Sequence, residues 1–199
     1  HASRRGRYAS PEGLGQAFNF DLLQADFDAD EFREIITRNL AEATESGASS
    51  TWVFSNHDVV RHATRYGLPK GGGKHAKGQD GKGWLLAGAP PEELDVELGL
   101  RRARAATQLM LALPGSAYLY QGEELGLQEV ADIPDSERQD PTFFRNKGVE
   151  IGRDGCRVPL PWAAEGSSFG FGDGGAHLPQ PAWFGRYAVA AEDGVEGST

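Results

Sequence analysis

Hydrophobic and polar positions alternate or recur with a regular period along the first half of the chain. Residues 17–22 alternate aromatic and polar side chains and predict a short strand. Asp28 and Glu31 form a capping-box pattern, and apolar residues then recur on one helical face until Gly47, which predicts a helix. Residues 51–54 (TWVF) are β-branched and aromatic and predict a second strand.

A second helix and a third strand follow further along the chain. Helical periodicity covers residues 92–113 and ends at Pro114-Gly115, and residues 116–120 (SAYLY) predict a strand. After Leu127 the chain is rich in Gly, Pro, Asp and Arg and shows no strong period. Strands that alternate with helix-length connections are typical of a parallel sheet, so the predicted class is α/β.

Two α/β architectures share this order, the doubly wound sheet and the (β/α)8 barrel. Both bind ligands at the carboxyl ends of their strands. A dinucleotide-binding sheet would carry a G-x-G-x-x-G turn after a strand, and none stands there, so the barrel is favoured. Because a whole barrel takes about 250 residues, the three predicted strands indicate less than half of one.

The segment 67–91 differs in composition from its surroundings. It is rich in Gly, Lys and Pro and includes the run Gly71-Gly72-Gly73. Such composition predicts a long irregular loop, an insertion or lid within one domain that spans residues 1–199.

Composition and charge exclude several functional classes. Hydrophobic residues are 39% and charged residues 25%, a globular balance, and 20 Lys+Arg against 29 Asp+Glu give a net charge of −9 that disfavours nucleic acid as a partner. No stretch approaches the roughly 20 apolar residues that cross a membrane.

The single cysteine, Cys156, forms no internal disulfide and favours a cytoplasmic protein. The chain begins at His1 and its only methionine is Met110, so we expect a missing N-terminus.

Polar side chains directly follow the strand 51–54. Asn56, His57 and Asp58 supply an amide, an imidazole and a carboxylate, which together suit a polyhydroxylated ligand. In a sugar site, Asp58 would stabilise the positive charge of an oxocarbenium-like transition state. The alternative, a turn or helix cap rich in Asn and Asp, stays open. His62, His75 and His177 stand apart from other metal-ligand residue types, so neither a metal nor a cofactor is expected.

Four segments resemble one family, the α-amylase family or glycoside hydrolase family 13. Residues 51–58 (TWVFSNHD) resemble its fourth signature region, residues 18–21 (FNFD) its sixth strand, and residues 116–126 (SAYLYQGEELG) its eighth strand and following turn. Residues 153–162 (RDGCRVPLPW) are similar to a segment of its α-glucosidase and oligo-1,6-glucosidase branch, of actinobacterial type. The resemblance implies the C-terminal part of a (β/α)8 TIM barrel, about strands 6 to 8, incomplete at the N-terminus.

The resemblance also implies roles for individual residues. Asp58 matches the family's transition-state stabiliser, and His57 matches the histidine that hydrogen-bonds the sugar at the cleaved bond, with Asn56 beside them. Arg153 resembles the arginine that clamps the same ring and pairs with an acidic residue from an earlier loop, absent here. A plain surface pairing of Arg153 with Asp154 or another nearby carboxylate is the alternative.

Other residues near these motifs also have expected roles. Arg157 shares the role of the sugar clamp or braces its loop, and Arg61 reaches the leaving-group side. Adjacent side chains diverge, so Glu123 and Glu124 are expected to be structural rather than an acid/base pair. Cys156 is expected to be inert packing.

The implied activity is retaining hydrolysis of α-glucosidic bonds in short gluco-oligosaccharides, which makes a small oligosaccharide the expected partner. The family's nucleophilic Asp and acid/base Glu end earlier strands that would precede His1, so the isolated fragment is expected to be inactive. The alternatives are a glucosyl-transferring relative, of trehalose synthase or sucrose-processing type, and a non-catalytic barrel-derived protein for binding or assembly.

Overall fold

The computed structural model describes residues 7–10, 12–70, 80–196 and 198, and the chain divides into two compact units. Unit 1 consists of His1–Phe54 and Ala105–Leu119, and unit 2 of Ser55–Arg104 and Tyr120–Thr199. The helix α6 (Val96–Ala112) begins in unit 2 and ends in unit 1. The chain therefore leaves unit 1 after Phe54 and returns to it along α6.

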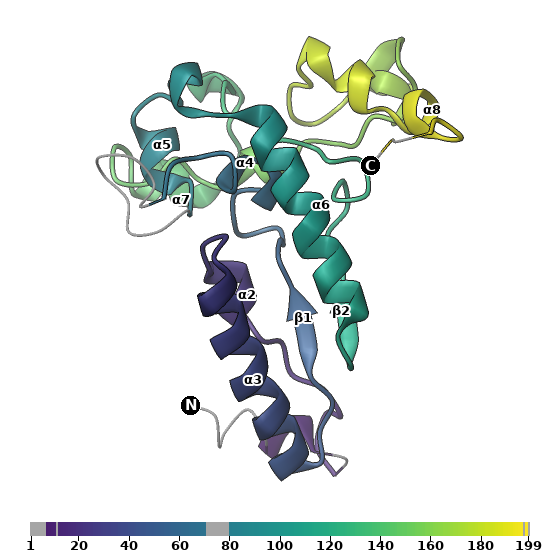
Figure 1. Ribbon diagram of the computed structural model, residues 1–199. Coiled ribbons are helices and arrows are strands. Elements are labelled where there is room, and N and C mark those ends of the chain that lie inside the picture. The colour runs from purple at the N-terminus through teal and green to yellow at the C-terminus, as the bar shows by residue number, and fades with distance from the viewer. Residues whose placement is uncertain (1–6, 11, 71–79, 197, 199) are drawn as a thin grey trace. The chain divides into compact units, whose positions relative to one another are not determined.

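Unit 1 contains a two-stranded parallel sheet. The strands β1 (Thr51–Val53) and β2 (Ser116–Tyr118) pair in the register Thr51↔Ser116 and Val53↔Tyr118. Figure 1 shows the helix α3 (Ala29–Ser46) alongside β1, with the short helix α2 (Asp21–Gln24) before it in the chain. The parallel pairing of the second and third predicted strands is confirmed, because a helix-containing connection returns the chain to the same end of the sheet.

The helix α3 begins and ends where the sequence predicts. The Asp28 carboxylate accepts hydrogen bonds from the backbone N–H groups of Asp30 and Glu31, and Gly47 ends the helix with a left-handed φ of 68°. The Glu31 carboxylate accepts a hydrogen bond from the Asp26 backbone N–H, just before the helix, at 3.2 Å. Phe32 and Ile35 of this helix are buried.

The strand predicted at residues 17–22 is wrong. Its first part carries no backbone ladder, and Asp21 begins α2. The Asn19 backbone N–H donates to Oγ1 of Thr51 at 3.0 Å, and the Thr51 hydroxyl donates to the Ala17 carbonyl at 2.8 Å. The segment is therefore hydrogen-bonded to β1 through a single side chain, that of Thr51. Hydropathy patterns do not reveal a contact of this type.

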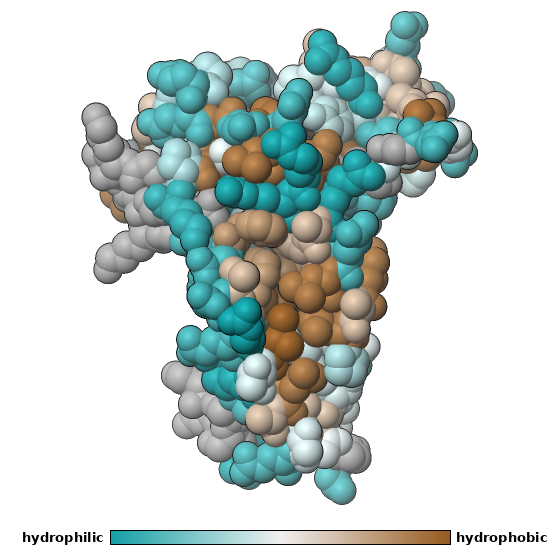
Figure 2. All heavy atoms as spheres, in the orientation of Figure 1, coloured by the Kyte–Doolittle hydropathy of each residue, from teal (hydrophilic) through white to brown (hydrophobic). Residues whose placement is uncertain are grey.

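The aromatic residues of unit 1 divide into a buried and an exposed group. Trp52 and Phe54 are buried, and Nε1 of Trp52 donates to the Pro114 carbonyl at 2.8 Å. Phe18 and Phe20 are 54% and 46% exposed, and their rings stack with centroids 6.0 Å apart. Trp52 and Phe54 therefore belong to the core of unit 1, whereas Phe18 and Phe20 do not. Figure 2 shows further apolar side chains over the strands of this unit.

Unit 2 is built from short helices and loops. Its α-helices are α4 (His62–Arg65), α5 (Lys82–Leu86), α7 (Pro141–Arg145) and α8 (Val189–Glu192). Its 3-10 helices are η1 (Pro91–Glu93), η2 (Asp135–Glu137), η3 (Asp154–Cys156), η4 (Ser167–Gly170) and η5 (Ala182–Tyr187). Within the described ranges, no helix has the length and apolar character needed to span a membrane.

Two apolar clusters stabilise unit 2. One gathers Leu125, Leu127, Val130, Ile133, Val158, Leu178 and Phe184, and the other Val60, Leu68, Trp84 and Leu85. Residues after Leu127 thus supply most of the first cluster. They show no periodic pattern, because apolar residues in loops point into the core one at a time. Burial, rather than regular structure, organises this half of the chain.

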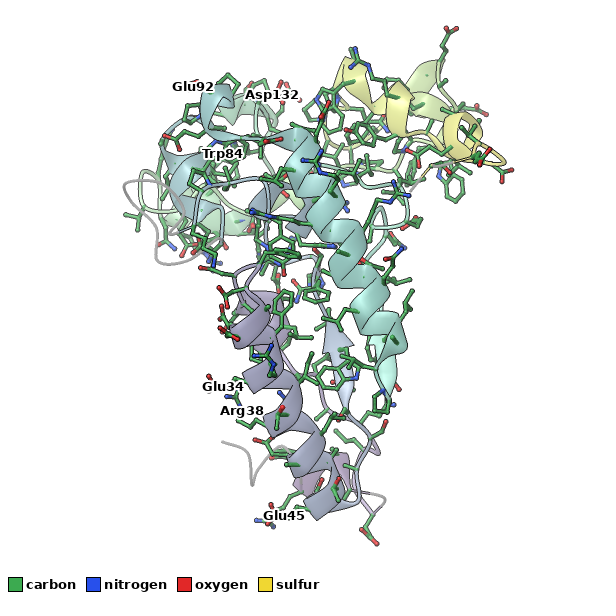
Figure 3. All side chains as sticks on the ribbon, in the orientation of Figure 1. Glu34, Arg38, Glu45, Trp84, Glu92 and Asp132 are labelled. Carbon is green, nitrogen blue, oxygen red and sulfur yellow. The ribbon has the colours of Figure 1, made fainter. Side chains whose placement is uncertain are left out.

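The segment 67–91 is not irregular throughout its described part. Residues 82–86 form α5, whose Trp84 is buried, and its indole N–H donates to the Pro90 carbonyl at 3.0 Å (Figure 3). The run Gly71-Gly72-Gly73 and His75 lie outside the described residues. The stretch that includes α5 therefore packs into the core of unit 2.

Candidate active site

A compact turn in unit 2 presents the three polar residues that follow β1 in the sequence. Oδ1 of Asn56 accepts a hydrogen bond from the Asp58 backbone N–H at 2.8 Å. Nε2 of His57 lies 3.5 Å from Oδ2 of Asp58. Asn56 thus shapes the turn, as the turn alternative proposed, while the side chains of His57 and Asp58 remain 66% and 47% exposed and open to a ligand.

Two arginines from a distant part of the sequence hold one oxygen of Asp58. Nη1 of Arg153 lies 2.7 Å and Nη2 of Arg157 3.1 Å from Oδ1 of Asp58. Nε of Arg157 also donates to the His57 carbonyl at 2.8 Å. Arg153 and Arg157 flank the 3-10 helix η3, and this single turn lets both guanidinium groups reach the same carboxylate. The structure therefore brings together five of the six site residues that the sequence predicted.

Arg153 has a second carboxylate partner, Asp140, whose side chain is fully buried. Nε and Nη2 of Arg153 donate to Oδ2 and Oδ1 of Asp140 at 2.6 and 3.0 Å, and the Arg153 backbone N–H donates to Oδ2 at 2.8 Å. The paired Arg153 guanidinium holds the pKa of the Asp140 carboxyl well below its usual range. Asp140 thus stays ionised.

Asp154, the alternative partner named from the sequence, forms no hydrogen bond with the Arg153 guanidinium. Its carboxylate accepts from the backbone N–H groups of Gln139 and Asp140 at 3.0 to 3.2 Å. The loop before α7 and the loop around η3 are therefore held together by one carboxylate from each. Asp154 fixes the backbone before α7, and Asp140 fixes the backbone and side chain of Arg153.

Glycine at position 155 lets this loop approach its neighbour. A Cβ atom there would collide with Oε1 of Glu129 and with the backbone carbonyl of Val130. The Val130 backbone N–H in turn donates to the Gly155 carbonyl at 3.3 Å. The second glycine of the loop, Gly152, has a φ of +81°, a left-handed conformation that other residues rarely adopt.

A small cavity of about 230 Å³ opens beside Asp58 and Arg153, with Val60, Lys82 and Glu129 among its lining residues. A larger cavity of about 680 Å³ lies in unit 1. Its lining is mainly Ala and Ser, and its Asn19 and Asn39 are hydrogen-bonded to each other. We place the candidate site at the smaller cavity, because the charged constellation borders it.

Arg61, the sixth predicted site residue, stands apart from the Asp58 carboxylate. Arg61 as a whole is 5% exposed. Its Nη1 and Nη2 atoms donate to the carbonyls of Gln121 and Cys156 at 2.7 and 3.0 Å. The guanidinium also lies 5.0 Å from the centre of the Tyr120 ring. Arg61 therefore connects its own segment to the segments of Gln121 and Cys156. Because its guanidinium is engaged in these bonds, the geometry argues against the leaving-group contact expected from the sequence.

Glu129 and Cys156 line the same cavity as Asp58, but neither forms a hydrogen bond with the Asp58 side chain. Burial raises the pKa of Glu129 to about 7, although its carboxylate accepts a bond from the Arg61 backbone N–H at 3.0 Å. Burial also raises the pKa of the Cys156 thiol well above its usual range, and the thiol donates to the Arg153 carbonyl at 3.2 Å. Cys156 is therefore unreactive packing, as expected.

A buried Ser55, His62 and Glu123 cluster has the residue types of a nucleophilic triad but not its geometry. Both the Ser55 hydroxyl and Oε1 of Glu123 approach the same ring atom, Nδ1 of His62, at 2.9 and 3.5 Å. A triad needs the hydroxyl and the carboxylate on opposite nitrogens. The cluster is also closed to solvent, so Glu123 is structural, as the sequence predicted.

Sequence reasoning missed Asp140. The pair Asp140-Pro141 signals a helix N-terminus, and the Asp140 carboxylate does cap α7 by accepting from the Thr142 backbone N–H at 2.9 Å. A capping signal says nothing about a second partner that lies in another loop. Among the described residues, no group of three or more His, Cys, Asp or Glu is placed to hold a metal ion.

The chain is similar in sequence to known glycoside-acting proteins. It is 30% identical over 194 residues to a protein named probable alpha-glucosidase from Rhizobium meliloti (strain 1021), covering 97% of this chain and 30% of that protein. It is 29% identical over 170 residues to Maltase 1 of Drosophila virilis, covering 81% and 22%. The chain therefore spans less than a third of the length of these relatives.

Solved structures agree with the sequence matches. An alpha-glucosyl transfer enzyme superimposes with a TM-score of 0.73 at 31% identity, covering 99% of this chain and 31% of its own. The trehalose-6-phosphate hydrolase of Bacillus licheniformis superimposes with a TM-score of 0.65 at 23% identity, covering 100% and 36%, which shows a shared fold.

The family model of the α-amylase catalytic domain matches residues 93–197, more than half of the chain. This segment contains β2, both arginines of the site and Asp140. The chain therefore belongs to the α-amylase family, glycoside hydrolase family 13, and has the fold of a part of that family's TIM-barrel catalytic domain.

Proposed function

We propose that this chain supplies the transition-state-stabilising part of the active site of a retaining α-glucosidase that acts on short gluco-oligosaccharides. The observation that carries the proposal is the Asp58 carboxylate, about half exposed beside a small cavity and held at one oxygen by Arg153 and Arg157. A carboxylate fixed in this way stabilises the positive charge that develops on a sugar ring as its glycosidic bond breaks.

The remaining site residues have matching roles in this proposal. His57, exposed next to Asp58, hydrogen-bonds the hydroxyl groups of the bound glucose unit. Arg153 and Arg157 fix the orientation of Asp58, and Asn56 maintains the turn. The cavity of about 230 Å³ is smaller than the roughly 300–1,000 Å³ of drug-sized sites, which suits a single sugar unit.

The two carboxyl groups that break the bond are assigned outside this chain. Retaining hydrolysis needs a nucleophile and a general acid/base about 5 to 5.5 Å apart. In the proposed arrangement β1 and β2 are the seventh and eighth strands of the barrel, and earlier strands of a longer protein carry the nucleophilic Asp and the acid/base Glu. The 199-residue chain alone is then inactive. The single cysteine supports a cytoplasmic location.

The first test is the reading frame upstream of the His1 codon. The proposal expects an open frame that encodes strands ending in an Asp and a Glu. A stop codon directly upstream, or strands without these carboxylates, contradicts it and favours a non-catalytic binding protein.

The second test uses the full-length protein and p-nitrophenyl α-D-glucoside. We expect hydrolysis by the wild-type protein, a loss of about 10²-fold or more in kcat for Asp58→Asn, and no hydrolysis by the 199-residue chain. Undiminished activity of Asp58→Asn, or hydrolysis by the isolated chain, overturns the proposal. The exposed substitution Asp30→Asn on α3 is the control for a general loss of charge.

Glucosyl transfer is the second candidate, favoured by the 31% identity to an alpha-glucosyl transfer enzyme. Both reactions pass through the same glucosyl-enzyme intermediate, which water or a sugar hydroxyl then attacks. With p-nitrophenyl α-D-glucoside as both donor and acceptor, equal release of p-nitrophenol and glucose indicates hydrolysis. An excess of p-nitrophenol over glucose indicates transfer to a second substrate molecule.

A further inference from the structure

The Arg153 guanidinium divides its nitrogen atoms between two carboxylates. Nε and Nη2 face the two oxygens of Asp140, and Nη1 faces Oδ1 of Asp58. Two parallel bonds between a planar guanidinium and a carboxylate fix the plane of the guanidinium as well as its position. The remaining nitrogen, Nη1, is therefore held at one place, 2.7 Å from Asp58.

We propose that Asp140 is a positioning residue that acts on catalysis through Arg153; the inference rests on the proposed role of Asp58 as transition-state stabiliser. Asp140 has two effects on the site. It orients the guanidinium so that only Nη1 reaches Asp58, and its negative charge balances the positive charge of Arg153. Both effects preserve the negative field of Asp58 toward a cationic sugar ring.

The surroundings of Asp140 fit this role. Its side chain is fully buried, whereas that of Arg153 is 36% exposed, so the pair has a fixed inner member and an outer member that faces the site. The Asp140 carboxylate also accepts from the Thr142 backbone N–H at the start of α7. Its own backbone N–H donates to Asp154 at 3.0 Å. The residue is thus anchored from both sides before it meets Arg153.

Without the Asp140 charge, Arg153 has one carboxylate left to pair with. Its guanidinium then turns toward Asp58, occupies both carboxylate oxygens and reduces the negative charge that the transition state experiences. Substrate binding through other contacts is affected less. The proposal therefore predicts a fall in kcat with a small change in KM, the pattern of an interaction that acts in the transition state.

The test is a double-mutant cycle in the full-length enzyme with p-nitrophenyl α-D-glucoside as substrate. The variants are Asp140→Asn, Arg153→Lys and the double variant, with Asp135→Asn as the control, because Asp135 is 62% exposed and acidic in the same segment. We expect Asp140→Asn to lower kcat by about 10²-fold, with KM changed less than about threefold. In the Arg153→Lys background the same substitution has little further effect, since the two residues act as a unit.

A conservative variant separates the positioning effect of Asp140 from its effect on stability, and thermal melting shows whether each variant is folded. Asp140→Glu keeps the negative charge and both acceptor oxygens, and we expect it to recover part of the kcat lost in Asp140→Asn. If Asp140→Asn does not fold, the coupling between Asp140→Glu and Arg153→Lys decides instead. Additive effects in the cycle, or a kcat of Asp140→Asn within twofold of wild type, overturn the inference. Full activity of Asp58→Asn in the same assay is a different result, which rejects the proposed function and this inference with it.

Discussion

Nδ1 of His62 lies 3.5 Å from Oε1 of Glu123, and both side chains are almost wholly buried in unit 2. Burial raises the pKa of Glu123 to about 8, opposed by the nearby Tyr120 backbone amide, Arg61 and the Ser55 hydroxyl. Burial and the positive charge of Arg65 lower the pKa of His62 to about 3. Near pH 6 the pair therefore consists of a neutral carboxylic acid and a neutral imidazole.

This pair makes stability depend on pH. The folded-state pKa of Glu123 lies above its unfolded value of 4.5, so its contribution is fully present below pH 4.5 and is lost as pH rises to about 8. Glu123→Gln, which is always neutral, should remove this loss and raise the free energy of unfolding at pH 9, relative to wild type, by about 1–3 kcal/mol. Urea unfolding at pH 6 and pH 9 measures the difference.

The exposed substitution Glu97→Gln is the matched control, because the Glu97 side chain is 90% exposed on α6. It should leave the pH dependence as in wild type. An equal pH dependence in wild type and Glu123→Gln would show that Glu123 is ionised across this range.

Gly155→Ala should destabilise unit 2 by about 1–3 kcal/mol, because the added methyl group meets the Glu129 carboxylate and the Val130 carbonyl, and the loop has to move. Gly172→Ala is the control, since a Cβ there meets open space. Denaturant midpoints of the two variants give the comparison. Equal midpoints would mean that the loop yields without cost.

Arg157→Lys should lower kcat/KM of the full-length enzyme about tenfold, equivalent to about 1.4 kcal/mol. A lysine ammonium reaches either Asp58 or the His57 carbonyl, but it lacks the two-nitrogen fork that contacts both at once. Steady-state kinetics with p-nitrophenyl α-D-glucoside test this. Arg33→Lys, at an exposed ion pair on α3, should have no effect.

The 199-residue chain on its own should self-associate. Its stacked Phe18 and Phe20 rings are about half exposed, and exposed apolar surface beside a short parallel sheet favours contact with other copies. Sedimentation velocity should show species larger than the monomer, reduced by the double substitution Phe18→Ser with Phe20→Ser. Phe171→Ser, which removes a ring 50% exposed in unit 2, is the control. A purely monomeric wild-type chain would contradict the prediction.

The sequence by itself determined the elements whose signals are local. The cap at Asp28, the stop at Gly47 and the β-branched run at residues 51–54 fix α3 and β1, because each signal acts within a few residues of the backbone it controls. The motif residues Asp58, Arg153 and Arg157 also stood out in the sequence, and the structure brings them together.

Tertiary structure alone decided which partner each charged group has. Arg153 pairs with Asp140 rather than Asp154, and Arg61 turns to backbone carbonyls rather than to the cavity. It also decided that Trp84 is core and that residues 17–20 follow β1 through the Thr51 hydroxyl. Such contacts join residues far apart in the chain, and the energy that selects them depends on burial and distance, which no local pattern records.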